Sequence, residues 1–463
     1  MSHPTSGRRS VSRRVRLDTT TVLAVVLPLL TIGSLLLVRP GDAPDTSRPP
    51  SRTTLTSASV VCPSAMPGSP GGYLSTSSKG AHGKVDVTAD SKGSKARLRE
   101  GTVTTVQPGT GPFVVTGEDE MAPGLVGARF GGAGELASVA CPAPAPDVWF
   151  TGIGAGARHD SVLELVNPDA GPAVADVTVS AGTGPIDVPR LRGVSVPGHS
   201  SVRLDLGQVA PRRGELALHV VTSRGRLSST VLDSSDELGR GQASQDWLAA
   251  QETPSTDNVL LALGAGPGGR LLALANDGDS EVRATVKFIS EDSVFAPEGI
   301  GEVRVPPQGV ARLALSAALQ SAIAKGVIGV EVTSEQPLTA TLRTFADGDL
   351  SHAVAGPQIR SGASVIVPTG AKKVLLAGAR AVGAATVVAR SATGEELART
   401  RADLRPGRGT VVTVPPGATL VSVVPENTTV SGAVIVSGAG AAVVPLTESL
   451  TSGLVPDVRP GLS

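Results

Sequence analysis

The amino-acid sequence predicts an all-β protein: tandem antiparallel β-sandwich repeats, Ig-like in architecture, after one N-terminal transmembrane helix. Three observations support this. Residues 19–38 carry no charged side chain. A phrase built on Val-x-Pro recurs four times at the interval of a domain. Short apolar segments alternate with Gly-, Pro- and Asn-rich turns, while aromatic residues make up only 2% of the chain, as expected for a core of Val and Leu on many short strands.

The uncharged run from Thr19 to Val38 is long enough, as an α-helix, to cross the roughly 30 Å hydrocarbon core of a bilayer. Five arginines precede it, namely Arg8, Arg9, Arg13, Arg14 and Arg16. The positive-inside rule therefore predicts a cytoplasmic basic tail, residues 1–18, and an extracytoplasmic remainder. A cleaved signal peptide is the alternative, but no small-residue cleavage site follows the run. A buried core helix is disfavoured because the run has no polar face. We expect a retained single-pass anchor in the cell membrane.

The rest of the chain divides at the recurring phrase, whose copies begin at Val106, Val196, Val305 and Val414. Intervals of about 90 to 110 residues suit tandem domains, whereas the blades of a propeller, the rival architecture, run to about half this length. A stretch rich in Pro, Ser, Asp and Arg predicts a disordered linker. The predicted parts are the linker at 39–55, sandwiches at 56–145, 146–252, 256–358 and 362–449, and a C-terminal tail at 450–463.

Each later repeat opens with an apolar strand and a Gly-rich turn, such as Val148-Trp-Phe-Thr-Gly. Alternating strands follow, for example Val174-Ala-Asp-Val-Thr-Val. Six to seven such strands in about 100 residues are typical of an antiparallel β-sandwich. We expect a single short helix, from Leu315 to Ala324, which Lys325-Gly326 would end.

The two cysteines, Cys62 and Cys141, occur in similar contexts, Val-Val-Cys-Pro and Val-Ala-Cys-Pro. Two thiols in an exported chain indicate one disulfide, which would join the first and last strands of the first sandwich. Closing a loop of about 80 residues would stabilise the fold by roughly 4 kcal/mol in the chain-entropy model. A Cys₂ metal site is the alternative, but no histidine or further cysteine is near in sequence to complete it.

No motif predicts catalysis, a cofactor or a metal ion, and we expect no enzyme. His159-Asp160-Ser161 names the members of a hydrolase triad, but neighbouring residues on a strand point to opposite faces and cannot form the relay by themselves. The six histidines are scattered without metal-ligand spacing. The Gly-rich segment 152–157 fits a dinucleotide template, yet a strand follows where that template needs a helix. Asn276-Asp277-Gly278 lacks the ligand spacing of a calcium loop and indicates a turn.

The few aromatic residues supply the candidate contact sites. Trp149 and Phe150 open the second sandwich and are expected in its core or between domains. Trp247 lies between two repeats, where it would wedge two domains together, and it is the preferred contact residue. Grooves that bind glycans or single-stranded nucleic acid commonly use exposed aromatic rings for stacking. The scarcity of aromatic residues in this chain therefore disfavours such grooves.

Three features together resemble one protein family. They are the Trp149-Phe150-x-Gly152 opening, the segment Ser161-x-Leu-x-Leu-x-Asn167-Pro168 and the recurring Val-x-Pro phrase. The family is an uncharacterised actinobacterial group of membrane-anchored secreted proteins, classed as a domain of unknown function. The resemblance implies a cell-envelope location and carries over no catalytic residue.

The sequence therefore favours a non-catalytic scaffold or interaction protein of the bacterial cell envelope, anchored in the membrane through residues 19–38. Its expected partners are envelope proteins or cell-wall glycans, and the balanced charge of 41 basic and 41 acidic residues argues against nucleic acid. The alternative is a cell-surface glycan-binding or adhesive module. An enzyme whose residues meet from distant positions would need a pocket holding paired carboxylates or a His–Asp pair.

Overall fold

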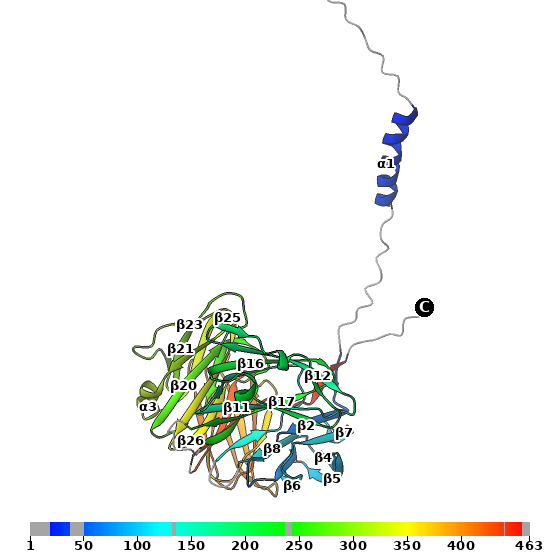
Figure 1. Cartoon of the computed structure of the whole chain (residues 1–463). Helices are drawn as coiled ribbons and strands as arrows, with labels where there is room; N and C mark the ends of the chain where they lie inside the picture. The colour runs from blue at the N-terminus through cyan, green and yellow to red at the C-terminus, as the bar shows by residue number, and fades with distance from the viewer. Residues whose placement is uncertain (1–18, 38–50, 132–135, 237–242, 439, 456–463) are drawn as a thin grey trace, which may run out of the picture. The chain divides into compact units, whose positions relative to one another are not determined.

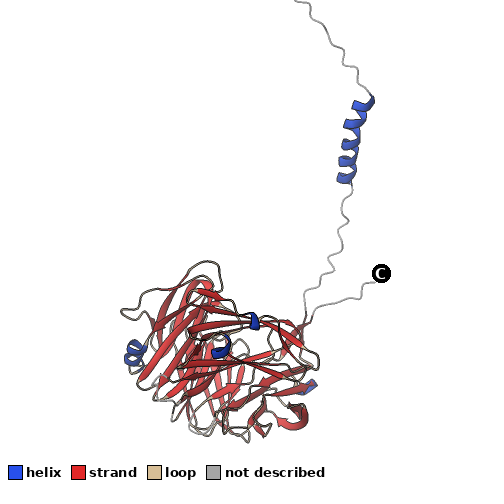
Figure 2. Cartoon of the chain, viewed as in Figure 1, coloured by secondary structure: helices blue, strands red, loops and turns tan. Residues whose placement is uncertain are grey.

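Strands dominate the computed structural model, which describes residues 19–37, 51–131, 136–236, 243–438 and 440–455 (Figures 1 and 2). The chain forms two units, residues 1–53 with 454–463, and residues 54–453. The expected β class is confirmed, since the second unit consists of antiparallel sheets. An Ig-like repeat is not confirmed.

The first unit contains helix α1 (Thr19–Leu37), which includes Pro28. Within the described ranges, no helix is both long and apolar enough to cross a membrane, so the predicted transmembrane helix is not confirmed. Part of the predicted linker and part of the predicted tail form a two-stranded sheet of β1 (Ser51–Thr54) and β35 (Ser452–Val455). The predicted basic tail 1–18, linker residues 39–50 and tail residues 456–463 lie outside the described residues.

Four consecutive stretches of the second unit each surround a hydrophobic core of their own. We call them the first to fourth sandwich. The first pairs a sheet of order β2-β7-β4-β5 with one of order β6-β3-β8-β9. Its elements are β2 (Ser57–Cys62), β3 (Gly72–Thr76), β4 (His82–Ala89), β5 (Lys92–Arg99), β6 (Thr104–Val106), β7 (Phe113–Glu118), the 3₁₀ turn η1 (Asp119–Met121), β8 (Leu125–Phe130) and β9 (Ser138–Ala140).

The second sandwich is one sheet of order β13-β12-β16-β10-β11-β17-β18, with β14 added to β12 and β15 to β11. It folds over a core that is mostly Val, Leu and Ala. Its elements are β10 (Asp147–Gly156), β11 (His159–Val166), β12 (Ala173–Ala181), β13 (Gly184–Ile186), η2 (Pro189–Leu191), β14 (Val194–Val196), β15 (Ser201–Asp205), α2 (Leu206–Val209), β16 (Arg213–Arg224), β17 (Ser228–Ser235) and β18 (Ser244–Leu248).

The third sandwich is organised around one long strand, β25, which pairs with β19 and β21 in its first half and with β20 and β26 in its second. The expected helix is confirmed as α3, but it is not the single helix of the β unit, because α2 is also present. The elements are β19 (Ser255–Leu261), β20 (Gly268–Ala275), β21 (Val282–Ser290), β22 (Val294–Phe295), β23 (Val303–Val305), β24 (Val310–Ala314), α3 (Ser316–Ile323), β25 (Val327–Ala346) and β26 (Asp349–Val354).

The fourth sandwich pairs two four-stranded sheets, of orders β27-β32-β29-β30 and β31-β28-β33-β34. Its core comes from alternate residues of both sheets, as the period of a strand requires. The elements are β27 (Ala363–Ile366), β28 (Ala371–Ala377), β29 (Gly383–Arg390), β30 (Glu396–Leu404), β31 (Thr410–Val414), β32 (Leu420–Glu426), β33 (Ser431–Ser437) and β34 (Ala441–Pro445).

The last strands of the four sandwiches meet one another. Strand β9 contacts β18, β18 contacts β26, β26 contacts β34, and β34 contacts β9 again. Each is the outer strand of a hairpin that closes its sandwich. The four sandwiches therefore form a closed cycle of contacts. In Figure 1, strands β20, β21 and β25 of the third sandwich group together, apart from β2, β4, β5 and β7 of the first.

Candidate functional site

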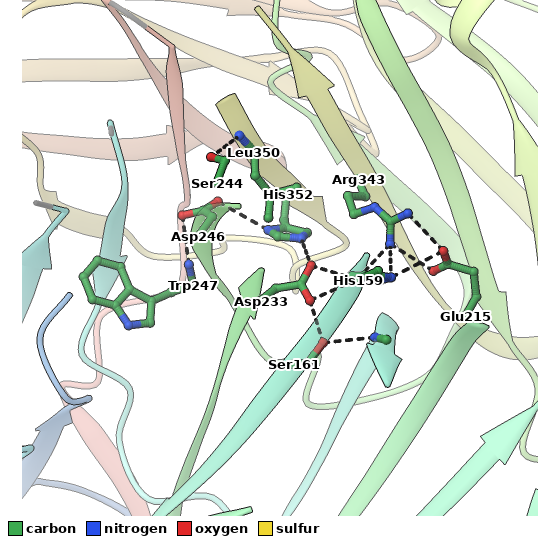
Figure 3. Close-up of polar contacts among 11 residues, drawn as sticks. His159, Ser161, Glu215, Asp233, Ser244, Asp246, Trp247, Arg343, Leu350 and His352 are labelled. Atoms are coloured by element: carbon green, nitrogen blue, oxygen red, sulfur yellow. Dashed lines mark hydrogen bonds and ion pairs between the residues drawn. The ribbon is translucent and has the colours of Figure 1, made fainter. Parts of the chain in front are cut away.

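A cluster of buried and half-buried charged side chains lies where the second sandwich contacts the third (Figure 3). The second sandwich supplies residues from β11, β16, β17 and β18, and the third supplies one residue each from β25 and β26. The charged members are His159, Glu215, Asp233, Asp246, Arg343 and His352, and Ser161 completes the cluster.

The strand register of the second sandwich brings these residues into one row. Ser161 on β11 lies directly opposite Asp233 on β17, and Asp233 lies directly opposite Asp246 on β18. His159 is two residues before Ser161 and therefore faces the same side of the sheet. Asp160, which lies between them in the sequence, points away. Its carboxylate accepts a hydrogen bond from the backbone N–H of Gly207. The expectation that three consecutive residues cannot form a relay is consistent with this geometry.

Asp233 is the centre of the cluster and is completely buried. Its carboxylate accepts hydrogen bonds from Ser161 Oγ at 2.5 Å, from His159 Nε2 at 3.0 Å and from His352 Nε2 at 2.9 Å. Burial alone would raise the pKa of Asp233. The charge of His159 and the hydrogen bonds from both histidines outweigh it and hold that pKa well below its usual range.

His352 reaches from the third sandwich between two carboxylates of the second. Its Nε2 donates to Asp233, and its Nδ1 lies 3.3 Å from Asp246 Oδ2. Burial lowers the pKa of His352, but the bonds to both carboxylates outweigh it and the pKa is raised. Burial raises the pKa of Asp246 to about 6, although His352 and the Trp247 backbone N–H oppose this rise.

The other end of the cluster joins His159, Arg343 and Glu215. Arg343 Nη2 pairs with Glu215 Oε1 at 3.0 Å, and Arg343 Nη1 lies 2.6 Å from His159 Nδ1. Burial lowers the pKa of His159, but the charge of Asp233 and hydrogen bonds with Asp233 and Glu215 raise it to about 9. Because two carboxylates face this ring against one guanidinium, we assign His159 a positive charge at neutral pH. Glu215 contacts both cations, since its Oε1 lies 3.0 Å from Arg343 Nη2 and 3.6 Å from His159 Nδ1.

This arrangement does not support acyl transfer. A catalytic serine needs a histidine that accepts its proton, whereas Ser161 donates to Asp233 and accepts from the backbone N–H of Gly154 at 3.0 Å. Three cations face three carboxylates, so the charges balance when Asp246 is ionised. The cluster therefore joins two sandwiches through paired charges.

The aromatic residues singled out in the sequence are all buried. Trp247 is 5% exposed and packs with Met66, Ala137 and Val139 of the first sandwich. Trp149 stacks on His219 with ring centroids 3.8 Å apart, and Phe150 belongs to the core of the second sandwich. Trp247 thus lies between the first and second sandwiches. Its role as a contact for a partner stays a prediction, and the burial of its ring speaks against that role.

The predicted disulfide is confirmed. Cys62 at the end of β2 is bonded to Cys141 just after β9, with Cα atoms 4.4 Å apart. The turn at Asn276 is a hydrogen-bonded loop, since its side chain accepts from the Gly278 N–H and donates to the Ser280 carbonyl. Among the described residues, no group of His, Cys, Asp or Glu side chains could hold a metal ion.

Sequence reasoning found two members of the charged cluster and missed the others. His159 and Ser161 stood out as a motif, whereas Asp233 and His352 are 72 or more residues away along the chain. The only local signal was the alternation that places positions 159 and 161 on one face. The partners follow from strand pairing and from the contact between sandwiches, which no short motif encodes.

Comparison with protein families gives one match. Residues 87–415 match a family of unknown function (DUF5719). The chain belongs to this family. All members of the charged cluster lie inside the matched region, whereas Cys62 and α1 lie before it. A search of curated proteins gives no match.

Proposed function

We propose that this DUF5719 protein is a non-catalytic scaffold or interaction protein of the bacterial cell envelope, held at the membrane by residues 19–38. The observation that carries the proposal is the charged cluster. Its histidine and carboxylate groups could in principle perform acid–base chemistry. They are instead paired with one another where the second sandwich contacts the third. Such pairing fixes two sandwiches relative to each other. The loops of the β unit are then available to partners.

The disulfide supports an extracytoplasmic location, because disulfides persist mainly in oxidising compartments. Attachment to the membrane rests on the N-terminal sequence. Helix α1 carries no charge, several of its apolar side chains are exposed, among them Leu27, Leu29 and Leu30, and arginines precede it. An exposed apolar helix needs a cover, and a lipid bilayer supplies one.

The test is crosslinking of the full chain in living cells, followed by affinity purification and mass spectrometry. The expected result is reproducible recovery of an envelope protein or a cell-wall glycan. A matched sample removes the five arginines that precede residue 19, which should lower membrane recovery and the crosslinks together. Recovery of cytoplasmic partners only, or of free thiols at Cys62 and Cys141 in intact cells, would refute the proposal.

The alternative is a cell-surface glycan-binding or adhesive module. Of the aromatic residues, all of which lie in the described ranges, only Phe295 is exposed, at 41%. A stacking platform of several aromatic rings is therefore absent from the described surface. Any glycan contact would have to use hydroxyl, carboxylate and aliphatic groups instead.

A further inference from the structure

A polar hollow of about 340 Å³ lies between the first and second sandwiches. The turn from β4 to β5 forms one side, and the turn before β15, which contains the second Val-x-Pro phrase, forms the other. The polar lining is Thr88, Asp90, Ser91, Asn167, His199, Ser200 and Ser201, and the apolar lining is Pro112, Val114 and Val166.

Most of the polar side chains in this hollow are not used by the chain itself. Within the described ranges, no hydrogen bond or ion pair engages the side chains of Thr88, Asp90, Ser91, His199, Ser200 or Ser201. Only Asn167 is engaged, since its amide donates to the carbonyls of Gly171 and Val196. Six side chains with donors or acceptors therefore line the hollow with their hydrogen-bonding capacity open to a ligand.

The repeat supplies a comparison for His199. In the third sandwich, the corresponding turn holds Gln308, whose amide donates to Asp279 at 2.6 Å. Both residues have a left-handed backbone, with φ of 50° for His199 and 48° for Gln308. In the third sandwich, the side chain at this turn is thus hydrogen-bonded within the sandwich. In the second sandwich, the corresponding side chain of His199 lines the hollow.

The two sides of the hollow are held in place. Val61 and Val114 of the first sandwich pack on Val166 of the second. Next to them, the buried carboxylate of Glu164 accepts from Ser64 N at 2.7 Å and from Ser64 Oγ at 2.6 Å. A site built on such contacts is largely preformed, as small-molecule sites at domain interfaces usually are.

The chemistry of the lining selects one class of ligand. Hydroxyl groups both donate and accept, and a carboxylate accepts from two hydroxyls at once, so the hollow matches a molecule with several hydroxyl groups. Pro112, Val114 and Val166 offer an aliphatic surface for C–H groups. The carboxylate of Asp90 repels phosphate and other anions, and no aromatic ring is present to stack on a nucleobase.

We propose that this hollow binds a sugar unit, neutral or amino-substituted, at the end of an envelope glycan. The proposal rests on the proposed function and narrows its partner class. The volume lies at the lower end of the roughly 300–1,000 Å³ range of small-molecule sites, which suits a short saccharide terminus. Asp90 accepts hydrogen bonds from sugar hydroxyl groups on one side, and His199 and Ser200 contact the sugar from the other.

The test measures binding of methyl glycosides and of a hydrolysate of the host's cell-wall polysaccharide to the purified full chain by saturation-transfer NMR and calorimetry. Asp90→Ala and His199→Ala should each weaken binding about tenfold or more, because each removes a side chain that hydrogen-bonds the ligand. Asp279→Ala, which removes the partner of Gln308 in the third sandwich, should leave binding unchanged. Thermal unfolding of each variant shows that the fold is intact.

Two results would overturn the site. One is that neither the glycosides nor the hydrolysate binds, and the other is that Asp90→Ala and His199→Ala bind as the unsubstituted chain does. In either case, crosslinks to envelope proteins in cells would leave the proposed function standing without this site. Loss of those crosslinks together with intact sugar binding would instead overturn the scaffold function and keep the site.

Discussion

Asp233 shows how one buried carboxylate holds two sandwiches together. It accepts from two residues of its own sandwich and from His352 of the next one. A buried ion pair is weak evidence for net stability, but removing one partner leaves the other charge uncompensated in a low-dielectric interior. The cluster therefore makes separation of the second and third sandwiches unfavourable.

Asp233→Asn should lower the free energy of unfolding by about 3–5 kcal/mol, because it leaves two positively charged histidines without their shared counter-ion. Chemical denaturation at neutral pH measures this change. Asp187→Asn is the control, since Asp187 pairs with Arg192 at the exposed surface and should change stability little. A similar small loss in both variants would contradict the role given to Asp233.

The raised pKa of His159 predicts a pH dependence. A basic group whose pKa is raised on folding contributes stability that is complete below its unfolded value, near 6.5, and is lost as the pH rises through its folded value. With a folded pKa of about 9, the loss should fall between about pH 6.5 and 9 and be on the order of 3 kcal/mol.

Denaturation curves at several pH values measure that loss, and His159→Gln should remove most of it. His199→Gln is the matched control, because His199 is an exposed histidine outside the cluster. If the slope between pH 6.5 and 9 persisted in His159→Gln, another group would have to be its source.

At the scale of elements, the recurring Val-x-Pro phrase has a common physical requirement. The turn that contains the phrase has backbone carbonyl groups that need a hydrogen-bond donor. In each sandwich, one buried side chain supplies that donor. Arg129 donates to Gly109 and Gly111, Asn167 to Val196, Asn276 to Pro306, and Lys372 to Pro416 and Ala418. The donors differ in kind, whereas the need for a donor is the same, as expected for buried backbone groups.

Lys372→Met should lower the free energy of unfolding by about 1–3 kcal/mol or more, because Met keeps much of the volume but leaves three carbonyls, of Gly370, Pro416 and Ala418, without their donor. Lys373→Met is the matched control, since Lys373 is the exposed neighbour on the same strand. Equal effects in urea denaturation would show that the buried ammonium group is not required.

The elements were more predictable than the contacts between them. Alternation in Val174-Ala-Asp-Val-Thr-Val and the stop at Lys325-Gly326 predicted a strand and a helix that the structure contains. The single long strand β25, by contrast, is not evident from local patterns, and it runs through Gln336-Pro337 from one set of partner strands to another. Proline is tolerated there because the strand changes partners at this point. The cluster at Asp233 depends on contacts between sandwiches, which local patterns do not record.

At the scale of the whole β unit, the contacts close into a cycle. Trp247 links the first and second sandwiches, the charged cluster links the second and third, and an apolar patch including Leu261 and Leu375 links the third and fourth. A further patch, formed by Ala128, Ile366 and Leu420, links the fourth to the first. Each sandwich therefore has two neighbours, and we expect residues 54–453 to unfold together.

Trp247→Ala should make the unfolding of the β unit less cooperative, because it weakens the contact between the first and second sandwiches. Removing a buried tryptophan costs about 3–5 kcal/mol, and the loss falls on the contact between the first and second sandwiches. Calorimetry should show a single transition in the unsubstituted chain and an earlier, separate one in the variant. Phe295→Ala, at an exposed ring, is the control and should keep the single transition. A single transition in Trp247→Ala would contradict the link.

The closing contact between the fourth and first sandwiches also sets an order of events during synthesis. Tyr73, Val126 and Phe130 flank the surface that Ile366 and Leu420 cover. The ribosome makes this surface long before it makes the residues that cover it, and domains of a nascent chain fold from the N-terminus onward. The first sandwich must therefore wait with an apolar face open until nearly the whole chain has emerged. A chain that stops before residue 363 would keep that face exposed, where it could bind chaperones or associate with other chains.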